Sequence, residues 1–171
     1  MSPSEWTIRP IRPDDAAALD RLIGRMVAEL SGGGLKSSQP GDFAAALAAL
    51  PPLLCGVIAE RAGEAVGLCL WFPWFSTWRG RRGVYVQDLY VVPAARRSGL
   101  ARALLSEAVR QARASGAAFL RLDVDNGNTG GIALYESLGF AKKNETTFDL
   151  SDTAFERLAT ANARQADKPE A

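Results

Sequence analysis

A long apolar strand that runs into an amphipathic helix through a turn of small residues constrains the fold of this chain most. Val84 to Val92 is rich in β-branched and aromatic side chains, which favours a strand that ends at Pro93. From Ser98 to about Ser115 one apolar stripe recurs at helical spacing, made of Leu100, Ala101, Leu104, Leu105, Ala108, Val109 and Ala112. Such a helix buries its stripe against a neighbouring element, so a packed sheet-and-helix fold is expected.

Shorter elements fill the rest of the sequence. We expect further strands at 6–9, 55–60, 65–75, 119–124 and within 141–150, and further helices at about 14–30, 42–50 and 129–138. Ser31 to Gly34 is expected to be a loop, and Arg61 to Glu64 a hairpin turn. This order predicts an α+β fold with helices on both faces of the sheet, in one domain over residues 1–160 with a frayed tail over 161–171.

The composition removes several kinds of chemistry. The 171 residues include no histidine, which excludes zinc sites built on histidine and every triad that needs an imidazole base. Cys55 and Cys69 lie in apolar runs, without a Cys-x-x-Cys spacing, and are expected to pack as small core residues. We therefore expect no metal, and any proton transfer must use Asp, Glu, Tyr, Lys or water.

The charge balance gives no argument for a nucleic-acid or membrane partner. Twenty Lys and Arg stand against nineteen Asp and Glu, so the net charge is +1. The N-terminus has no apolar core behind a basic start, and no apolar stretch reaches about 18 residues. The expected location is the cytoplasm.

The turn after the long strand carries the features of an anion site. Ser98, Gly99 and Ala101 are small, and the first amides of a helix lack internal partners and favour negative charge. Arg96 and Arg97 add guanidinium groups that can grip phosphate oxygens. The turn has neither the P-loop pattern nor the G-x-G-x-x-G pattern of dinucleotide sites. Taken alone, it predicts either a phosphate site or an ordinary solvated helix start.

Two motifs together resemble those of a known family. The stretch from Arg96 to Ala101 resembles the acetyl-CoA signature of the GCN5-related N-acetyltransferases (GNAT), Q/R-x-x-G-x-G/A. The stretch from Asn128 to Phe140 resembles the family's second signature, N-x-x-A-x-x-L/F-Y-x-x-x-G-F. The chain departs from the pattern at Ser98 and Ala101, where Gly is frequent, and at Gly131, where Ala is common. All three replacements are small.

The resemblance covers about Thr7 to Leu150 and implies a mixed, mostly antiparallel central sheet. It also implies acetyl-CoA as co-substrate, with its pyrophosphate on the backbone amides of the turn. The residues that the resemblance assigns to this cofactor are Leu89, Tyr90, Val91, Arg96, Arg97, Ser98, Gly99, Leu100, Ala101, Arg102, Asn128 and Tyr135.

A narrower likeness lies in the strand upstream of the turn. Tyr85 to Val91 resembles the Y-L/V-E-D-L/F-Y/F-V strand of diamine and polyamine N-acetyltransferases, and Phe75 to Trp78 resembles their aromatic segment. This likeness implies that the acetyl acceptor is a primary amine of a small molecule, such as a diamine, a polyamine or an amino-acid-like compound. Gln87 stands where that branch usually has Glu, and an amide cannot accept a proton usefully.

Attack of an amine on a thioester needs an acid, an oxyanion site and a neutral amine. Tyr135 is the candidate acid for the leaving thiolate, because a phenol with a pKa near ~10 keeps its proton at neutral pH. Its alternative role is core packing. Backbone amides of Leu89, Tyr90 and Val91 are the oxyanion candidates if this strand is splayed, and a fully paired central strand is the alternative.

The base is left open. Gln87 can order a water, Asp88 points to the opposite face of the strand, and Asp123 can supply negative charge near the amine. A further possibility is that no residue acts as base and that the enzyme selects the neutral amine. For acceptor binding, Glu29 can pair with an ammonium and Trp78 can offer a cation–π face, although each also fits an ordinary surface position.

Three other functions compete with this prediction. The chain can be a non-catalytic acyl-CoA sensor, or it can acetylate a protein amine. It can also bind nucleic acid through Trp78 to Arg82, where aromatic and basic residues alternate. A solvated hairpin accounts for that last segment, and we expect no nucleic-acid partner. A homodimer is expected by analogy with the family.

Overall fold

The computed structural model describes residues 6–30 and 36–161, and the chain divides into two compact units between Ile132 and Ala133. The described part of the first unit holds one five-stranded sheet in the order β1 to β5. Its strands are β1 (Thr7–Pro10), β2 (Cys55–Arg61), β3 (Glu64–Ser76), β4 (Arg81–Val91) and β5 (Leu120–Leu122). Pairing is antiparallel from β1 to β4 and parallel between β4 and β5. The predicted mixed, mostly antiparallel sheet is confirmed.

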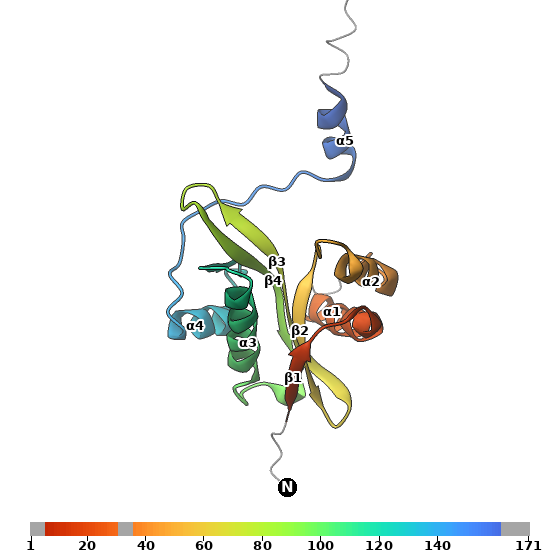
Figure 1. Cartoon of the computed structure of the whole chain (residues 1–171), viewed down its shortest axis with the longest axis vertical. Helices are drawn as coiled ribbons and strands as arrows, with labels where there is room; N and C mark the ends of the chain where they lie inside the picture. Colours follow the sequence, from red (N-terminus) through yellow and green to blue (C-terminus); the bar gives the residue numbers. More distant parts are fainter. Residues whose placement is uncertain (1–5, 31–35, 162–171) are drawn as a thin grey trace, which may run out of the picture. The chain divides into compact units, whose positions relative to one another are not determined.

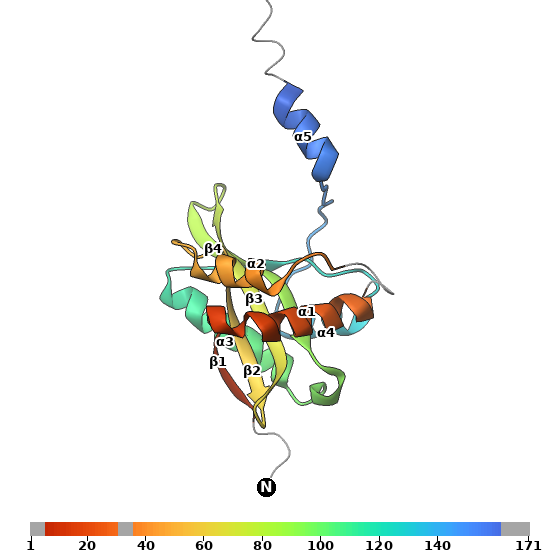
Figure 2. The same ribbon diagram turned by 90° about the vertical axis from the view of Figure 1, so that its right-hand side faces the viewer.

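Helices cover both faces of this sheet, as predicted (Figure 1). The helices α1 (Ala16–Leu30) and α2 (Pro40–Ala48) lie on one face, and α3 (Leu100–Ala114) lies on the other. Turning the molecule by 90° brings α1 and α2 in front of the strands (Figure 2). A short 3-10 turn, η1 (Pro13–Asp15), precedes α1. We refer to the two sides as the α1 face and the α3 face.

The register of β3 and β4 identifies which residues point to which face. Tyr90, which pairs with Leu68, reaches α1 through its hydroxyl, so these two residues belong to the α1 face. A Cβ at Gly67 would lie 3.1 Å from the Leu104 side chain of α3, so Gly67 belongs to the α3 face. Alternation along β3 then assigns every other residue of that strand.

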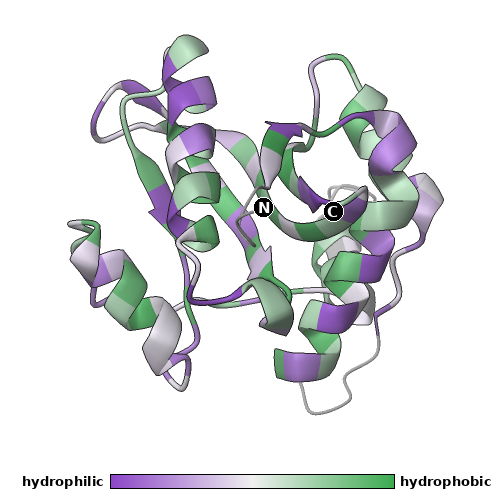
Figure 3. Cartoon of the chain, turned by 90° about the horizontal axis from the view of Figure 1, so that it is seen from below, coloured by the Kyte–Doolittle hydropathy of each residue, from purple (hydrophilic) through white to green (hydrophobic). Residues whose placement is uncertain are grey.

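The α3 helix buries most of the stripe that the sequence predicts. Leu100, Leu104, Leu105, Ala108 and Ala112 are buried, and burial of these side chains stabilises the packing of α3 on the sheet. The prediction that Val109 belongs to the buried stripe is wrong. Val109 lies at the edge of the stripe, and 47% of its surface is exposed. In Figure 3 the helices show both apolar and polar residues, as is usual for helices with one face packed against the protein.

The second unit begins inside α4 (Thr129–Ser137) and includes α5 (Asp152–Ala161). The prediction of a strand within 141–150 is wrong, because these residues have no regular secondary structure. The stretch is largely polar, and no neighbouring strand supplies the backbone hydrogen bonds that would hold it extended. The helix α5 was not predicted. The predicted loop from Ser31 to Gly34 lies outside the described residues, as does the predicted tail over 161–171 except Ala161, the last residue of α5.

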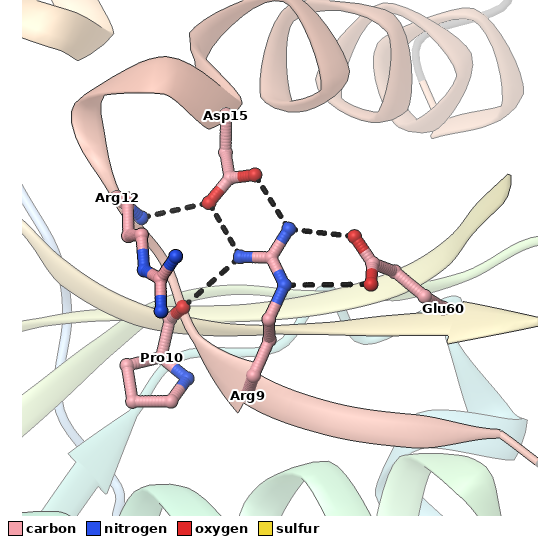
Figure 4. Close-up of polar contacts among 5 residues, drawn as sticks. All are labelled: Arg9, Pro10, Arg12, Asp15 and Glu60. Atoms are coloured by element: carbon pink, nitrogen blue, oxygen red, sulfur yellow. Dashed lines mark hydrogen bonds and ion pairs between the residues drawn. The ribbon is translucent and has the colours of Figure 1, made fainter. Parts of the chain in front are cut away.

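An arginine on β1 ties the start of α1 to the sheet (Figure 4). Two nitrogens of the Arg9 guanidinium donate to the Asp15 carboxylate, both at 2.7 Å, and Nη2 also donates to Glu60 on β2 at 2.6 Å. The backbone N–H of Arg12 donates to Asp15 at 2.8 Å. The hydrogen bonds from Arg9 lower the pKa of Asp15 below its usual value. This network holds β1, β2 and the entry to α1 in register.

Replacing Arg9 with Met should lower the free energy of unfolding by about 1–3 kcal/mol at pH 7, since two carboxylates lose a charged donor. A carboxylate with a lowered folded pKa stabilises the fold above its unfolded pKa and loses that effect as the pH falls through the folded value. The deficit should therefore shrink below about pH 4. Urea unfolding of the wild type and the variant at pH 7 and at pH 3 measures this difference in free energy of unfolding. Arg21→Met is the control, because Arg21 is exposed and its hydrogen bond to the Ala17 carbonyl stays within α1.

Candidate active site

The predicted phosphate turn is a tight loop between β4 and α3. A 3-10 turn, η2 (Pro93–Ala95), leads to Arg97 and Gly99, which both adopt positive φ, +57° and +84°. The Ser98 hydroxyl donates to the Ala95 carbonyl at 2.7 Å and closes the loop. Gly99 is the N-cap residue, so α3 starts at Leu100 rather than at Ser98 as predicted. The left-handed conformation at Gly99 is the reason that glycine suits this position.

The first amides of α3 lack partners inside the helix. The first internal hydrogen bond of α3 runs from the Ala103 N–H to the Gly99 carbonyl at 3.0 Å, so the amides of Leu100 and Ala101 precede the internal ladder. Glycine has no side chain to cap them, and among the described residues no atom beyond the adjoining chain lies within 4 Å of an ideal Cβ at Gly99. Buried Leu100 anchors the first turn of the helix. The helix start therefore offers donors and a positive dipole end to an anion.

The structure pairs Arg96 with Glu29, two residues that the sequence assigned to different ligands. Arg96 Nη2 forms an ion pair with the Glu29 carboxylate at the end of α1, and Arg96 Nε donates to the Val91 carbonyl at 2.9 Å. The Tyr90 hydroxyl donates to the other Glu29 oxygen at 2.5 Å. Hydrogen bonds from Tyr90 and then Arg96 lower the pKa of Glu29. Glu29 thus links α1 to the turn.

Among the described residues, the C-terminal part of β4 pairs with a strand on one side only. Its parallel pairing with β5 joins Val84 to Leu120 and ends where Val86 meets Leu122, whereas β4 itself continues to Val91. On the other side β3 pairs with β4 as far as Val91. Leu89, Tyr90 and Val91, the three residues proposed to hold an oxyanion, lie in this half-paired segment. The alternative in which β4 is hydrogen-bonded along its whole length on both sides is therefore excluded on the side of β5.

A β-bulge interrupts β4 at Gln87. Pairing passes from Leu70–Asp88 to Trp71–Val86, so Gln87 has no opposite residue on β3. Asp88 lies opposite Leu70, two residues from Leu68, and therefore on the α1 face. Tyr85 lies opposite Phe72 and shares that face, because the extra residue shifts the alternation by one. Gln87 itself is exposed.

Asp88 has an environment that the sequence did not reveal. It is half-buried, and its desolvation raises its pKa to about 6. The sequence placed it only among acceptor contacts. The sequence offered one signal of this buried environment, because Asp88 stands in the middle of a largely apolar strand, between Val86 and Leu89. A carboxyl group that titrates near neutral pH can accept a proton from an amine.

An aromatic layer occupies the α1 face near the β3–β4 turn. Its rings are Phe72 and Tyr85, stacked at 5.1 Å, and Trp74, which meets Tyr85 at 5.8 Å and Phe119 at 6.0 Å. Burial, and then the hydrogen bond to Asp123, raise the pKa of Tyr85 to about 12. Trp78 is fully exposed at the hairpin turn. The structure thus brings Asp123 to Tyr85 and leaves Trp78 outside the layer.

The second motif divides between the two units. Asn128, in the first unit, accepts a hydrogen bond from the Gly131 N–H at 2.9 Å and caps the start of α4. A Cβ at Gly131 would lie 2.9 Å from the Asn128 side chain, which accounts for glycine at this position. Tyr135, in the second unit, is half-buried, and its ring lies 5.5 Å from that of Phe140. This contact fits packing, and the acid role of Tyr135 stays a prediction.

Comparisons with known proteins identify relatives of the chain. The model of the acetyltransferase (GNAT) family matches residues 26–140. Thialysine N-epsilon-acetyltransferase of Caenorhabditis elegans is 32% identical, over 61% of this chain and 67% of the nematode protein. The uncharacterized N-acetyltransferase YhfO of Bacillus subtilis is 38% identical, over 49% of this chain and 56% of that protein. The matches thus span about half to two thirds of these relatives.

Solved structures agree on the fold. An aminoglycoside acetyltransferase from an uncultured soil sample, in complex with sisomicin, aligns with a TM-score of 0.75 at 14% identity, over 86% of this chain and 97% of that one. A ribosomal-protein-alanine N-acetyltransferase from Brucella melitensis aligns with a TM-score of 0.69 at 20% identity, over 86% and 99%. Across the described residues, none of the helices has the length and apolar character needed to cross a membrane.

Proposed function

The chain belongs to the GNAT acetyltransferase family, and from this premise we propose that it transfers the acetyl group of acetyl-CoA to a primary amine of a small molecule. The observation that carries the proposal is the half-paired end of β4, which leads directly into the amide-presenting turn before α3. Relatives named for thialysine and for methionine sulfoximine, 32% identical in each case, support a small amine as acceptor.

In this proposal the turn holds the donor. Amides from Ser98 to Arg102 bind the pyrophosphate of acetyl-CoA, and Arg97 adds charge at the exposed side of the loop. Arg96 acts mainly by fixing the turn against Glu29 and Val91. Asn128 contributes by shaping the start of α4. The pantetheine arm lies along the open side of β4.

The chemical step is a direct attack. The amine nitrogen forms a bond with the thioester carbon, and the negative charge that develops on the carbonyl oxygen is stabilised by β4 amides between Leu89 and Val91. As the intermediate collapses, the carbon–sulfur bond breaks. Tyr135 then donates its proton to the leaving thiolate, and free CoA and an acetylated amine are released.

Asp88 is the proposed proton acceptor. An amine is mostly protonated at neutral pH and must lose a proton before or during its attack. The Asp88 carboxylate, with a pKa of about 6, is ionised at pH 7 and basic enough to take that proton. Gln87, exposed at the bulge, can position a water between the amine and Asp88. This proposal therefore assigns the base to Asp88 and not to position 87, where the polyamine branch usually has Glu and this chain has Gln.

A thiol-release assay tests the proposed function. Purified protein is given acetyl-CoA and a panel of primary amines, and CoA binding is measured in parallel by calorimetry. We expect amine-dependent release of free thiol with at least one small amine. CoA binding without thiol release on any small amine would support the acyl-CoA sensor instead, and release only with a protein or peptide amine would support protein acetylation.

Replacing Gly99 with Val should raise the KM for acetyl-CoA by roughly 10- to 100-fold, with a smaller effect on kcat. A β-branched residue at φ +84° is strained, and its side chain covers the amides that we assign to the pyrophosphate. Gly116→Val is the matched control, because Gly116 has φ +87° just after the opposite, C-terminal end of α3. A comparable KM change in the control would show that the effect is general destabilisation.

Three further parts of the proposal rest on the family resemblance. These are a homodimer, a single acetyltransferase domain over residues 1–160 and a cytoplasmic location. Sedimentation at micromolar concentration tests the first, and limited proteolysis tests the second.

A further inference from the structure

We propose that Glu29 is a positioning residue for acetyl-CoA, whose carboxylate sets the spacing between the two backbone segments that hold this donor. These segments are the half-paired end of β4 and the turn before α3. This role rests on the proposed function and deepens it, since Glu29 then serves the acetyl donor rather than the acceptor ammonium for which its charge first suggested it.

The backbone at the end of β4 shows which polar groups lie on its edge away from β3. The Val92 N–H donates to the Val66 carbonyl of β3 at 3.0 Å, so the backbone polar groups of Val92 point toward β3. These groups alternate along an antiparallel strand, and those of Leu89 and Val91 therefore point to the opposite edge. Of the amides proposed to stabilise the oxyanion, those of Leu89 and Val91 are the ones on this edge.

Arg96 connects this edge of β4 to Glu29. Its Nε donates to the Val91 carbonyl at 2.9 Å, and its Nη2 pairs with the Glu29 carboxylate. Its guanidinium also lies over the Tyr90 ring, 5.8 Å from the ring centre. Three contacts therefore hold the side chain of the residue that opens the phosphate turn.

A single carboxylate on α1 thus contacts both segments. One Glu29 oxygen pairs with Arg96 at the turn, and the other accepts the Tyr90 hydroxyl of β4 at 2.5 Å. Hydrogen bonds from Tyr90 and Arg96 lower the pKa of Glu29, whereas burial, and then the bond to Glu29, raise the pKa of Tyr90 to about 12. At neutral pH Glu29 is therefore a charged acceptor and Tyr90 a donor.

The exposure of the ion pair argues against a mainly stabilising role. The side chains of Glu29 and Arg96 are 35% and 45% exposed, and ion pairs at such positions contribute little to folding. Both Glu29 oxygens already accept hydrogen bonds from the protein, so an acceptor ammonium would have to share them. Since α1 and α3 cover opposite faces of the sheet (Figure 1), the effect of Glu29 is to fix the approach to α3 against the end of β4.

Acetyl-CoA spans both segments, so its use should depend on their spacing. In the proposed function its thioester lies at the β4 amides and its pyrophosphate at the turn. S-acetylpantetheine carries the same thioester and the same arm without the pyrophosphate, and it contacts only the first segment. Loss of the Glu29 carboxylate should therefore weaken the use of acetyl-CoA more than the use of S-acetylpantetheine.

Glu29→Gln tests this role with the two donors. We expect the ratio of kcat/KM for acetyl-CoA to kcat/KM for S-acetylpantetheine to fall by roughly 10-fold, mainly through the KM for acetyl-CoA. The affinity for CoA, measured by calorimetry, should fall by a similar factor, and the midpoint of urea unfolding should stay close to that of wild type. Glu107→Gln is the matched control, because the ion pair of Glu107 with Arg110 stays within α3 and joins no two elements.

A double variant tests whether Glu29 acts through Arg96. Arg96→Gln should also lower the donor ratio, and the combined variant should lose little more than either single variant, since both remove the same link. Additive losses would mean that the two residues act separately and would overturn the role.

The outcomes separate this role from the proposed function. An equal loss with both donors would mean that Glu29 only supports the fold, and a raised KM for the amine with an unchanged donor ratio would return Glu29 to the acceptor; either result overturns the role and keeps the function. If no amine is acetylated, the proposed function itself fails. CoA affinity still tests Glu29 in that case, because wild-type affinity in Glu29→Gln would overturn its positioning role.

Discussion

Replacing Asp88 with Asn should lower kcat for acetyl transfer by about 10²- to 10³-fold and, at the same time, stabilise the folded protein at neutral pH. The two effects have one cause, since burial both makes the Asp88 carboxylate a better base and makes its charge costly to the fold. An amide of the same size keeps the shape of the side chain, removes the charge and cannot take a proton.

The pH dependence gives the sign of each effect. The folded pKa of Asp88, about 6, lies above its unfolded value of 3.8. Its contribution to stability is therefore fully present below the unfolded pKa and is lost as the pH rises through the folded pKa. The advantage of Asp88→Asn should grow between about pH 4 and pH 6 and then level off at roughly 2–3 kcal/mol. The wild-type kcat should fall on the acid side with a midpoint near the same pKa.

Urea unfolding and steady-state kinetics at a series of pH values measure both effects. Asp125→Asn is the control, because Asp125 is exposed and caps its own turn by accepting a bond from the Gly127 N–H at 2.7 Å. Loss of activity together with loss of stability in Asp88→Asn would mean that Asp88 supports the fold. An unchanged acid limb would assign the base elsewhere, with Gln87 and a bound water as the next candidates.

Replacing Tyr135 with Phe should lower kcat by about 10²-fold and leave the KM for acetyl-CoA within roughly threefold of wild type. The phenol is proposed to act only as the thiolate leaves, so its loss affects the chemical step more than binding. The ring of Phe preserves the packing against Phe140. The deficit should be smaller for an acetyl donor whose leaving group needs no proton.

Phe140→Leu separates chemistry from packing at this position. It alters the ring contact with Tyr135 and leaves the hydroxyl in place. If it lowers kcat as much as Tyr135→Phe does, the ring contact rather than the proton of Tyr135 carries the effect. Equal turnover in wild type and Tyr135→Phe across pH would contradict the acid assignment outright.

The sequence predicted the parts of the fold that depend on local pattern. The strand before the turn is rich in β-branched and aromatic residues and the helix after it has a clear period-3.6 stripe, so both were predicted from the sequence. The order of elements predicted an α+β fold, and the family resemblance implied the mixed sheet. The strand within 141–150 failed because a strand is stable only when another strand pairs with it, and a short polar stretch does not encode its partner. Gly99 was singled out as a small residue of the turn, and the structure adds that it adopts positive φ.

The candidate site was harder to predict, because its key relations join residues far apart in the chain. Glu29 and Arg96 are 67 positions apart, and no local pattern indicates that they pair. The bulge at Gln87 puts Tyr85 and Asp88 on one face, against the plain alternation that sequence reasoning assumes. The raised pKa of Asp88 depends on its burial in the folded protein. Each of these relations comes from tertiary packing.

The ratio of free CoA to acetylated amine, measured in the same reaction vessel, tests the central claim most directly. Thiol titration gives the first quantity, and mass spectrometry of the acceptor gives the second. An acetyltransferase that works by direct attack produces the two in equal amounts, at a rate that depends on both substrates. Free CoA without acetylated amine would indicate thioester hydrolysis, and neither product in the presence of tightly bound acetyl-CoA would contradict the account in favour of a binding module.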